Sequence, residues 1–159
     1  MLLKVQKDLH DPLWVPSLVS EYLDPEGFGQ LDPDKIAHIN FMVGELSLRQ
    51  NKNQDAQMFL EAVMPESSNY SKSRYLLGLI QVRQNNSEGA LGHFNAVLDS
   101  VPEDASSEEL RRVRSLALVA AGRVLYGMGR YAEASRHYKG VPRFSDFWFT
   151  SMYENAWSY

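Results

Sequence analysis

Residues 75–97 read YLLGLIQVRQNNSEGALGHFNAV, and they contain two apolar segments joined by a polar run at 84–87. Within each segment the apolar residues recur at intervals of three and four positions. This spacing is typical of amphipathic helices, and a cluster of Gln, Asn and Ser between them is typical of a turn. Gly78 lies in the first segment and Ala90 in the second. We therefore expect an antiparallel helix pair that crosses where its side chains are small.

A glycine and an alanine 12 positions apart occur three times along the chain, as Gly44 and Ala56, Gly78 and Ala90, and Gly122 and Ala134. The second pair follows the first after 34 residues, and the third follows the second after 44. Each alanine is followed at four and seven positions by a large apolar residue and a valine: Leu60 and Val63, Phe94 and Val97, and Tyr138 and Val141. Glycine inside a helix costs about 1 kcal/mol relative to alanine. We expect that a second helix approaches closely at each glycine, and that this packing compensates for the cost.

These units resemble tetratricopeptide repeats (TPRs). That family has 34-residue helix-turn-helix units, with a small residue in the first helix, an alanine early in the second and a proline near the end. Gly-Arg-Tyr-Ala-Glu-Ala at 129–134 is the closest match, and the terminal prolines are Pro65, Pro102 and Pro142. The resemblance implies an all-α fold, an α-solenoid of stacked antiparallel helix pairs in a right-handed superhelix. The pattern departs at Ser47, Gln81 and Asn155, where larger or apolar residues are usual, so we expect looser helix contacts there.

The resemblance divides residues 34–159 into units of about 37–70, 71–104 and 105–148, followed by the first helix of a fourth unit at 149–159. The third unit is ten residues longer, and its Ser106 and Glu109 form a capping-box pattern. We therefore expect an extended first helix from about Ser107 to Gly127. Residues 1–33 are predicted to form a divergent N-terminal helical cap on the first repeat, because a stacked array needs its open end covered. Pro33 after Asp32 suits the start of the next helix.

Half of the residues from 144 to 159 are aromatic or methionine: Phe144, Phe147, Trp148, Phe149, Met152, Tyr153, Trp157 and Tyr159. A repeat that ends an array normally has a polar outer face. We expect either that the sequence is a fragment of a longer repeat protein, or that this helix docks on another chain. Trp148, Tyr153 and Trp157 are the predicted docking residues. The two expectations are compatible, and an exposed apolar patch of this size favours self-association.

Composition and charge exclude several classes of function. A chain of 159 residues that is 44% hydrophobic and 23% charged is typical of one globular domain. No apolar run reaches the roughly 18 residues of a membrane span, and the absence of cysteine rules out disulfides. The formal net charge of −4 lies in residues 1–36, and no basic face is present to bind nucleic acid. We therefore expect no nucleic-acid partner and no membrane span.

Catalytic and metal-binding patterns are also missing from the sequence. The four histidines, at positions 10, 38, 93 and 137, have no second ligand at metal-site spacing. The sequence contains no nucleophile elbow and no glycine-rich phosphate loop. We therefore predict that the protein is not an enzyme and uses no cofactor or metal.

Recognition of another protein or peptide is the remaining function. In the family that the units resemble, the first helices line a concave groove that holds the partner. Carried onto this sequence, the groove residues are His38, Phe41, Glu45, Arg49, Lys72, Tyr75, Leu79, Arg83, Val119, Arg123 and Tyr126, continued by Tyr153 and Trp157. Apolar anchors would enter between the first helices, and arginines would pair with carboxylates of the partner. Aromatic residues at Phe41 and Tyr75 are equally compatible with packing inside each repeat.

The same resemblance argues against one narrower function. Phe41 and Glu45 occupy positions where relatives that clamp the acidic tails of chaperones need lysine and asparagine, so chaperone-tail binding is not expected.

The alternative function is that of a structural spacer with an empty groove, or a self-association element, in a larger repeat protein. The runs at 75–79 and 156–159 resemble those of long bacterial repeat proteins of the cell envelope. This resemblance favours a periplasmic or envelope location over a cytoplasmic one.

Overall fold

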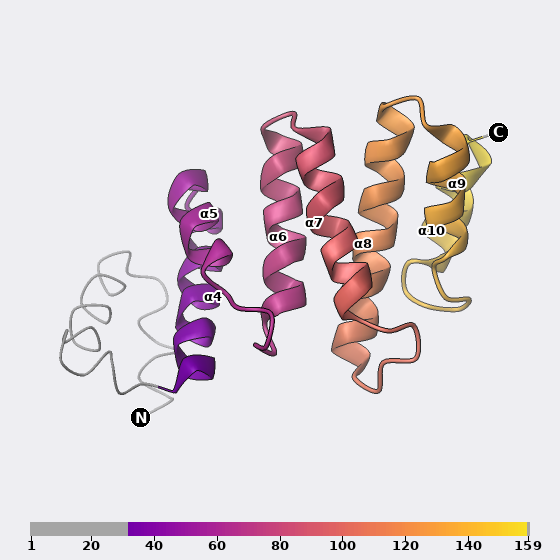
Figure 1. Ribbon diagram of the computed structural model, residues 1–159. Helices are drawn as coiled ribbons and strands as arrows, with labels where there is room; N and C mark the ends of the chain where they lie inside the picture. Colours follow the sequence, from indigo (N-terminus) through magenta and orange to yellow (C-terminus); the bar gives the residue numbers. More distant parts are fainter. Residues whose placement is uncertain (1–31, 159) are drawn as a thin grey trace.

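A computed structural model describes residues 32–158, which form seven α-helices and no β-strand. The helices are α4 (Pro33–Arg49), α5 (Asn53–Glu61), α6 (Tyr70–Arg83), α7 (Ser87–Ser100), α8 (Glu108–Gly127), α9 (Tyr131–Lys139) and α10 (Trp148–Ala156). In Figure 1 they stand side by side in chain order, and each packs against the next. The all-α prediction is confirmed over this range. Tyr159 and the segment 1–31, which holds nearly all of the predicted cap, lie outside the described residues.

The same turn joins the helices of each of the pairs α4–α5, α6–α7 and α8–α9. One residue of each turn has left-handed backbone: Asn51 (φ 60°), Asn85 (φ 58°) and Gly129 (φ 75°). The next amide donates to the carbonyl five residues earlier at 2.9 Å, from Lys52 to Ser47, from Asn86 to Gln81 and from Arg130 to Leu125. This is the Schellman helix ending, which favours glycine or asparagine at the left-handed position. The repeated spacing in the sequence therefore corresponds to a repeated turn.

The three glycines lie where paired helices touch, as expected. A Cβ added to Gly44 would lie 2.6 Å from Leu60 Cγ, and one added to Gly122 would lie 2.7 Å from Tyr138 Cε1. A Cβ on Gly78 would overlap the ring of Phe94. The partner alanines, Ala56, Ala90 and Ala134, are completely buried. Small residues on both helices therefore allow each large apolar side chain to cover the facing backbone.

The buried apolar side chains form two clusters along the row of helices. The smaller one lies between α4, α5 and α6 and contains Ala56, Leu60, Leu77 and Ile80. The larger one extends through α7, α8 and α9 and is centred on Phe94, Leu125 and Tyr138. Tyr75 and Leu79 of α6 pack against the larger cluster, so α6 contacts both.

Helix α8 corresponds to the extended helix expected in the third unit, but the predicted capping residue is wrong by one position. Ser107, not Ser106, is the N-cap, and its hydroxyl accepts a hydrogen bond from the Leu110 amide at 3.4 Å. The reason lies in Arg111, whose guanidinium donates to the carbonyls of Ala105 at 2.6 Å and Ser106 at 3.0 Å. These bonds hold the two residues outside the helix.

Arg114 also fixes the loop before α8. Its guanidinium donates to the carbonyl of Leu98 at 2.7 Å, near the end of α7. The carbonyls of the last helical turn have no partner inside the helix, and a cation there is favourable. The basic run at 111–114 therefore contributes to folding of the long connection.

Gln81, one of the three positions where we expected looser helix contacts, is buried and hydrogen-bonded within its own turn. It is only 8% exposed, and its side-chain oxygen accepts a hydrogen bond from Asn86 Nδ2 at 2.6 Å. Asn86 in turn caps α7, because its Oδ1 accepts from the Gly89 amide at 3.1 Å. Asn155 differs, since its Oδ1 is buried and has no hydrogen-bond partner among the described residues. Burial of the Gln81 side chain is therefore accompanied by a hydrogen bond inside the α6–α7 turn.

Candidate functional site

Side-chain contacts join α4 to α6, α6 to α8 and α8 to α10. Lys72 Nζ of α6 lies 5.9 Å from the centre of the Phe41 ring on α4 and 2.6 Å from Glu109 Oε1 on α8. Arg123 of α8 is bonded to Glu154 of α10. We call these side chains, together with Tyr75 between them, the first-helix row. It comprises Phe41, Lys72, Tyr75, Glu109, Arg123 and Glu154.

Tyr75 lies in the middle of the first-helix row. Its ring centre is 5.9 Å from that of Phe94 on α7, so one side of the ring packs inside the α6–α7 pair. Burial raises the pKa of the Tyr75 hydroxyl, and the positive charge of Arg123 acts in the opposite direction. The ring therefore both contacts the core and borders the charged end of the row.

The strongest polar contact of the first-helix row joins Arg123 to Glu154. Arg123 Nη2 donates to Glu154 Oε1 at 2.6 Å, and Nε donates to Oε2 at 2.9 Å. The hydrogen bond to this carboxylate raises the pKa of the Arg123 guanidinium. Two parallel bonds between a guanidinium and a carboxylate are the geometry that arginine adopts when it recognises carboxylates.

Tyr138 of α9 also contacts Glu154. Burial raises the pKa of the Tyr138 hydroxyl, and the charge and hydrogen bond of the Glu154 carboxylate raise it further. Glu154 was absent from the predicted site residues. It is 31 positions from Arg123, and no local motif marks such a pairing.

Four other predicted groove residues lie at the surface. Arg49 Nη2 pairs with Glu45 Oε1 of its own helix at 2.8 Å, a surface pair worth about 0.3–0.5 kcal/mol. His38 Nδ1 lies 3.2 Å from Asn69 Nδ2, which joins α4 to the loop before α6. Arg83 is exposed and has no ion-pair partner within residues 32–158.

The remaining groove residues belong partly to the core. Val119 is only 4% exposed and packs in the larger cluster, so it is not available to a partner. Helix α8 packs against α7 and α9 as well as α6, so much of its surface is covered by neighbouring helices. Leu79 is half-buried against the same cluster, and Tyr126 is exposed with its ring centre 5.1 Å from that of Tyr131.

The three predicted docking residues of the C-terminal segment lie in ring contacts. The ring of Trp148 lies between those of Phe144, at 4.8 Å, and Phe149, at 4.9 Å. Tyr153 and Trp157 meet edge to face at 6.2 Å, and both are largely exposed. The structure therefore places these rings on one short helix and the loop before it.

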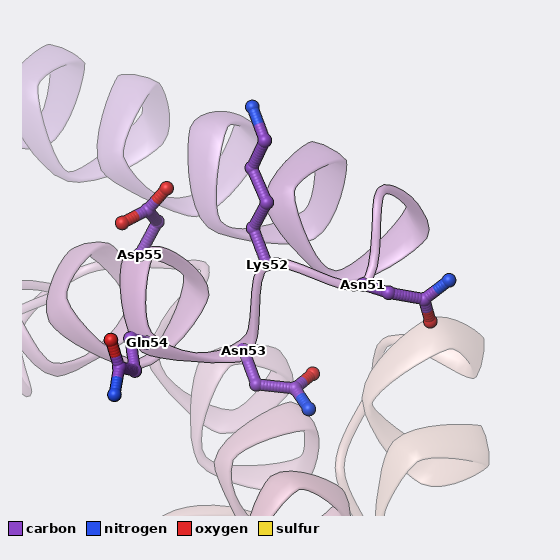
Figure 2. Close-up of a pocket in the computed structure, with 5 residues that line it drawn as sticks. All are labelled: Asn51, Lys52, Asn53, Gln54 and Asp55. Atoms are coloured by element: carbon purple, nitrogen blue, oxygen red, sulfur yellow. The ribbon is translucent and has the colours of Figure 1, made fainter.

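A hollow at the α4–α5 turn, lined by residues 51–55, was not among the predicted sites. Its lining side chains are Asn51, Lys52, Asn53, Gln54 and Asp55. Figure 2 shows them pointing in different directions, with Lys52 extended away from the other four. A ligand site needs polar groups that converge on one point. This arrangement does not provide them.

Within residues 32–158 no group of three or more His, Cys, Asp or Glu side chains is placed to hold a metal ion. No helix in the same range is long and apolar enough to cross a membrane. No protein-family model and no curated protein sequence matches the chain.

Proposed function

We propose that residues 34–159 form an array of TPR-like repeats, a right-handed α-solenoid, that binds a segment of another protein along its first helices. Three observations support the repeat architecture. The helix pairs share one Schellman turn, each pair crosses at a glycine, and helices pack in chain order. A stacked array of this kind exposes an extended surface built from equivalent helices.

The contact between Arg123 and Glu154 carries the functional part of the proposal. Here an arginine of the first-helix row holds a carboxylate in a two-bond geometry, beside the half-buried ring of Tyr75. Because Glu154 already occupies Arg123, a carboxylate of the partner would pair with an exposed cation elsewhere on the first helices. Arg83, near the end of α6, fits this role best. The partner is therefore a protein segment with apolar side chains and at least one acidic residue.

A displayed library of random peptides tests this proposal without knowledge of the natural partner. Peptides selected on the chain should contain acidic and apolar residues, and their affinity should fall about tenfold or more when Arg83→Glu reverses the charge. The matched control is Arg136→Glu, which makes the same charge change on α9, a second helix. The proposal fails if no peptide is enriched, or if both variants bind the selected peptides as the wild type does.

The alternative function, a structural or self-association element of a larger envelope-associated bacterial repeat protein, is favoured by one observation. The rings of Phe149, Tyr153 and Trp157 on α10 are exposed rather than packed within the chain.

A further inference from the structure

The largest exposed apolar surface within residues 32–158 lies on α10 and the loop before it. We call it the aromatic face, and it comprises Phe144, Phe149, Met152, Tyr153 and Trp157. Phe144 is 83% exposed, Phe149 74% and Trp157 63%. The four residues of α10 and its C-cap recur at intervals of one helical turn, so they form one stripe. Trp148 links Phe144 to this stripe through its ring contacts on either side.

The opposite side of α10 faces the rest of the protein with small and polar residues, and Phe147 at its N-cap packs against the larger cluster. Ser151 is the buried residue of the helix, and Ser158 is buried just beyond it. Glu154 is the helix's only charged side chain, and it pairs with Arg123 of α8 and Tyr138 of α9. The one charged side chain of α10 is therefore paired within the chain. The aromatic face itself is uncharged.

The area of the aromatic face is that of a protein interface. Side chains of this size bury about 150–250 Å² each, so at their observed exposures the five residues present about 700 Å². This exceeds the roughly 300–600 Å² of the largest patch on most monomers, and it approaches the roughly 800 Å² that each partner contributes to a stable complex.

The best matching surface on the described part of the chain is the same face of a second copy. The other exposed large apolar residues between 32 and 158 are scattered over other elements: Met42, Met58, Met64, Val82, Tyr126 and Tyr131. Two aromatic faces meet without charge repulsion, because neither carries a charge. A twofold interface also needs only one self-complementary patch. We propose that the chain forms a symmetric dimer in which the aromatic faces of two α10 helices pack against each other.

Sedimentation equilibrium of the chain over about a hundredfold range of concentration tests the dimer. We expect the wild type to change from the mass of one chain to twice that mass. The double variant Phe149→Ser and Tyr153→Ser should weaken dimerisation at least about tenfold. The control, Met58→Ser and Tyr131→Ser, removes two exposed apolar side chains elsewhere and should dimerise as the wild type does. A monomeric wild type, or equal dimerisation by the two double variants, would overturn the proposal.

Single-cysteine cross-linking tests which surfaces meet. Because the sequence contains no cysteine, the introduced residue is the only one that can form a disulfide. Tyr153 lies in the middle of the stripe, near the expected twofold axis. Under mild oxidation Tyr153→Cys should give a disulfide-linked dimer, whereas Met58→Cys on α5 should remain largely unlinked. Equal linking of the two variants, or growth to masses above the dimer, would show a head-to-tail or nonspecific contact and would also overturn the proposal.

Discussion

Gly78 marks the closest approach of two helices in the central pair. The ring of Phe94 occupies the space that a Cβ would need, and Phe94 itself is completely buried. In contrast, a Cβ on Gly92 of α7 would meet no atom within 4 Å. The two glycines therefore separate the effect of helix propensity from that of packing.

We expect Gly78→Ala to be about 1–3 kcal/mol less stable than Gly92→Ala, because only the first substitution overfills a packed crossing. Both variants gain the roughly 1 kcal/mol helix propensity of alanine, so this contribution cancels in the comparison. Urea denaturation gives the two free energies of unfolding. Equal stability of the variants would contradict the assignment of Gly78 to a tight crossing.

His93 on α7 predicts a dependence of stability on pH. Burial lowers the pKa of its imidazole, the charge of Arg74 lowers it further, and Glu61 partly opposes both. The unfolded chain therefore binds the proton more tightly, and the contribution of His93 to stability falls as the pH drops below about 6.5. Relative to the wild type, His93→Gln should be more favourable at pH 5.5 than at pH 7.5. The free energy of unfolding at the two pH values checks this, and a constant difference would contradict it.

The residues that could be predicted from the sequence are those whose role is local or repeated. The glycines at the crossings are fixed by their own helix pair, so equal spacing was sufficient to find them. Arg114 and Glu154 act on groups 13–16 and 31 positions away, so their roles depend on how the pairs stack. Val119 shows the same limit, because its burial in the larger cluster depends on how α8 packs against its neighbouring helices.

At the scale of elements, α10 differs from the other first helices in how it is attached. The α5–α6 contact contains Leu60, Leu77 and Ile80, which are completely buried. In α10, a buried serine and the Glu154 carboxylate take the place of such side chains. Because apolar burial supplies most of the free energy of helix packing, we expect α10 to be held by Phe147 at its N-cap, which packs against the larger cluster, and by the contact between Glu154 and Arg123.

Glu154→Gln should therefore loosen α10 selectively. The substitution keeps the shape of the side chain but removes the charge that faces Arg123, and with allowance for solvent this costs about 1 kcal/mol. We expect amide hydrogens of α10 to exchange about fivefold faster, with little change in α4 to α7. Glu103→Gln is the control, since Glu103 lies in the α7–α8 loop and is highly exposed. Hydrogen exchange in α10 that is equal in the two variants would show that the ionic contact does not hold the helix.

At the scale of the whole molecule, the two apolar clusters predict that stability is divided along the chain. The smaller cluster joins α4, α5 and α6, and the larger one joins α7, α8 and α9. In an array where each helix contacts mainly its neighbours, stability is the sum of units and of the interfaces between them. Destabilisation at one end should therefore decrease with distance along the row of helices in Figure 1.

Leu60→Ala tests this directly, because Leu60 is completely buried in the smaller cluster and covers Gly44. Truncation of a buried leucine costs about 2–5 kcal/mol. Native-state hydrogen exchange should report most of that loss in α4, α5 and α6, while amides of α8 and α9 keep most of their protection. Leu125→Ala in the larger cluster is the reciprocal variant, and it should reduce protection chiefly in α7, α8 and α9. Equal loss in all helices for both variants would mean that the two clusters behave as one cooperative core. That result would contradict a repeat array while leaving the all-helical fold intact, so the pair of variants distinguishes a repeat array from an ordinary helical bundle.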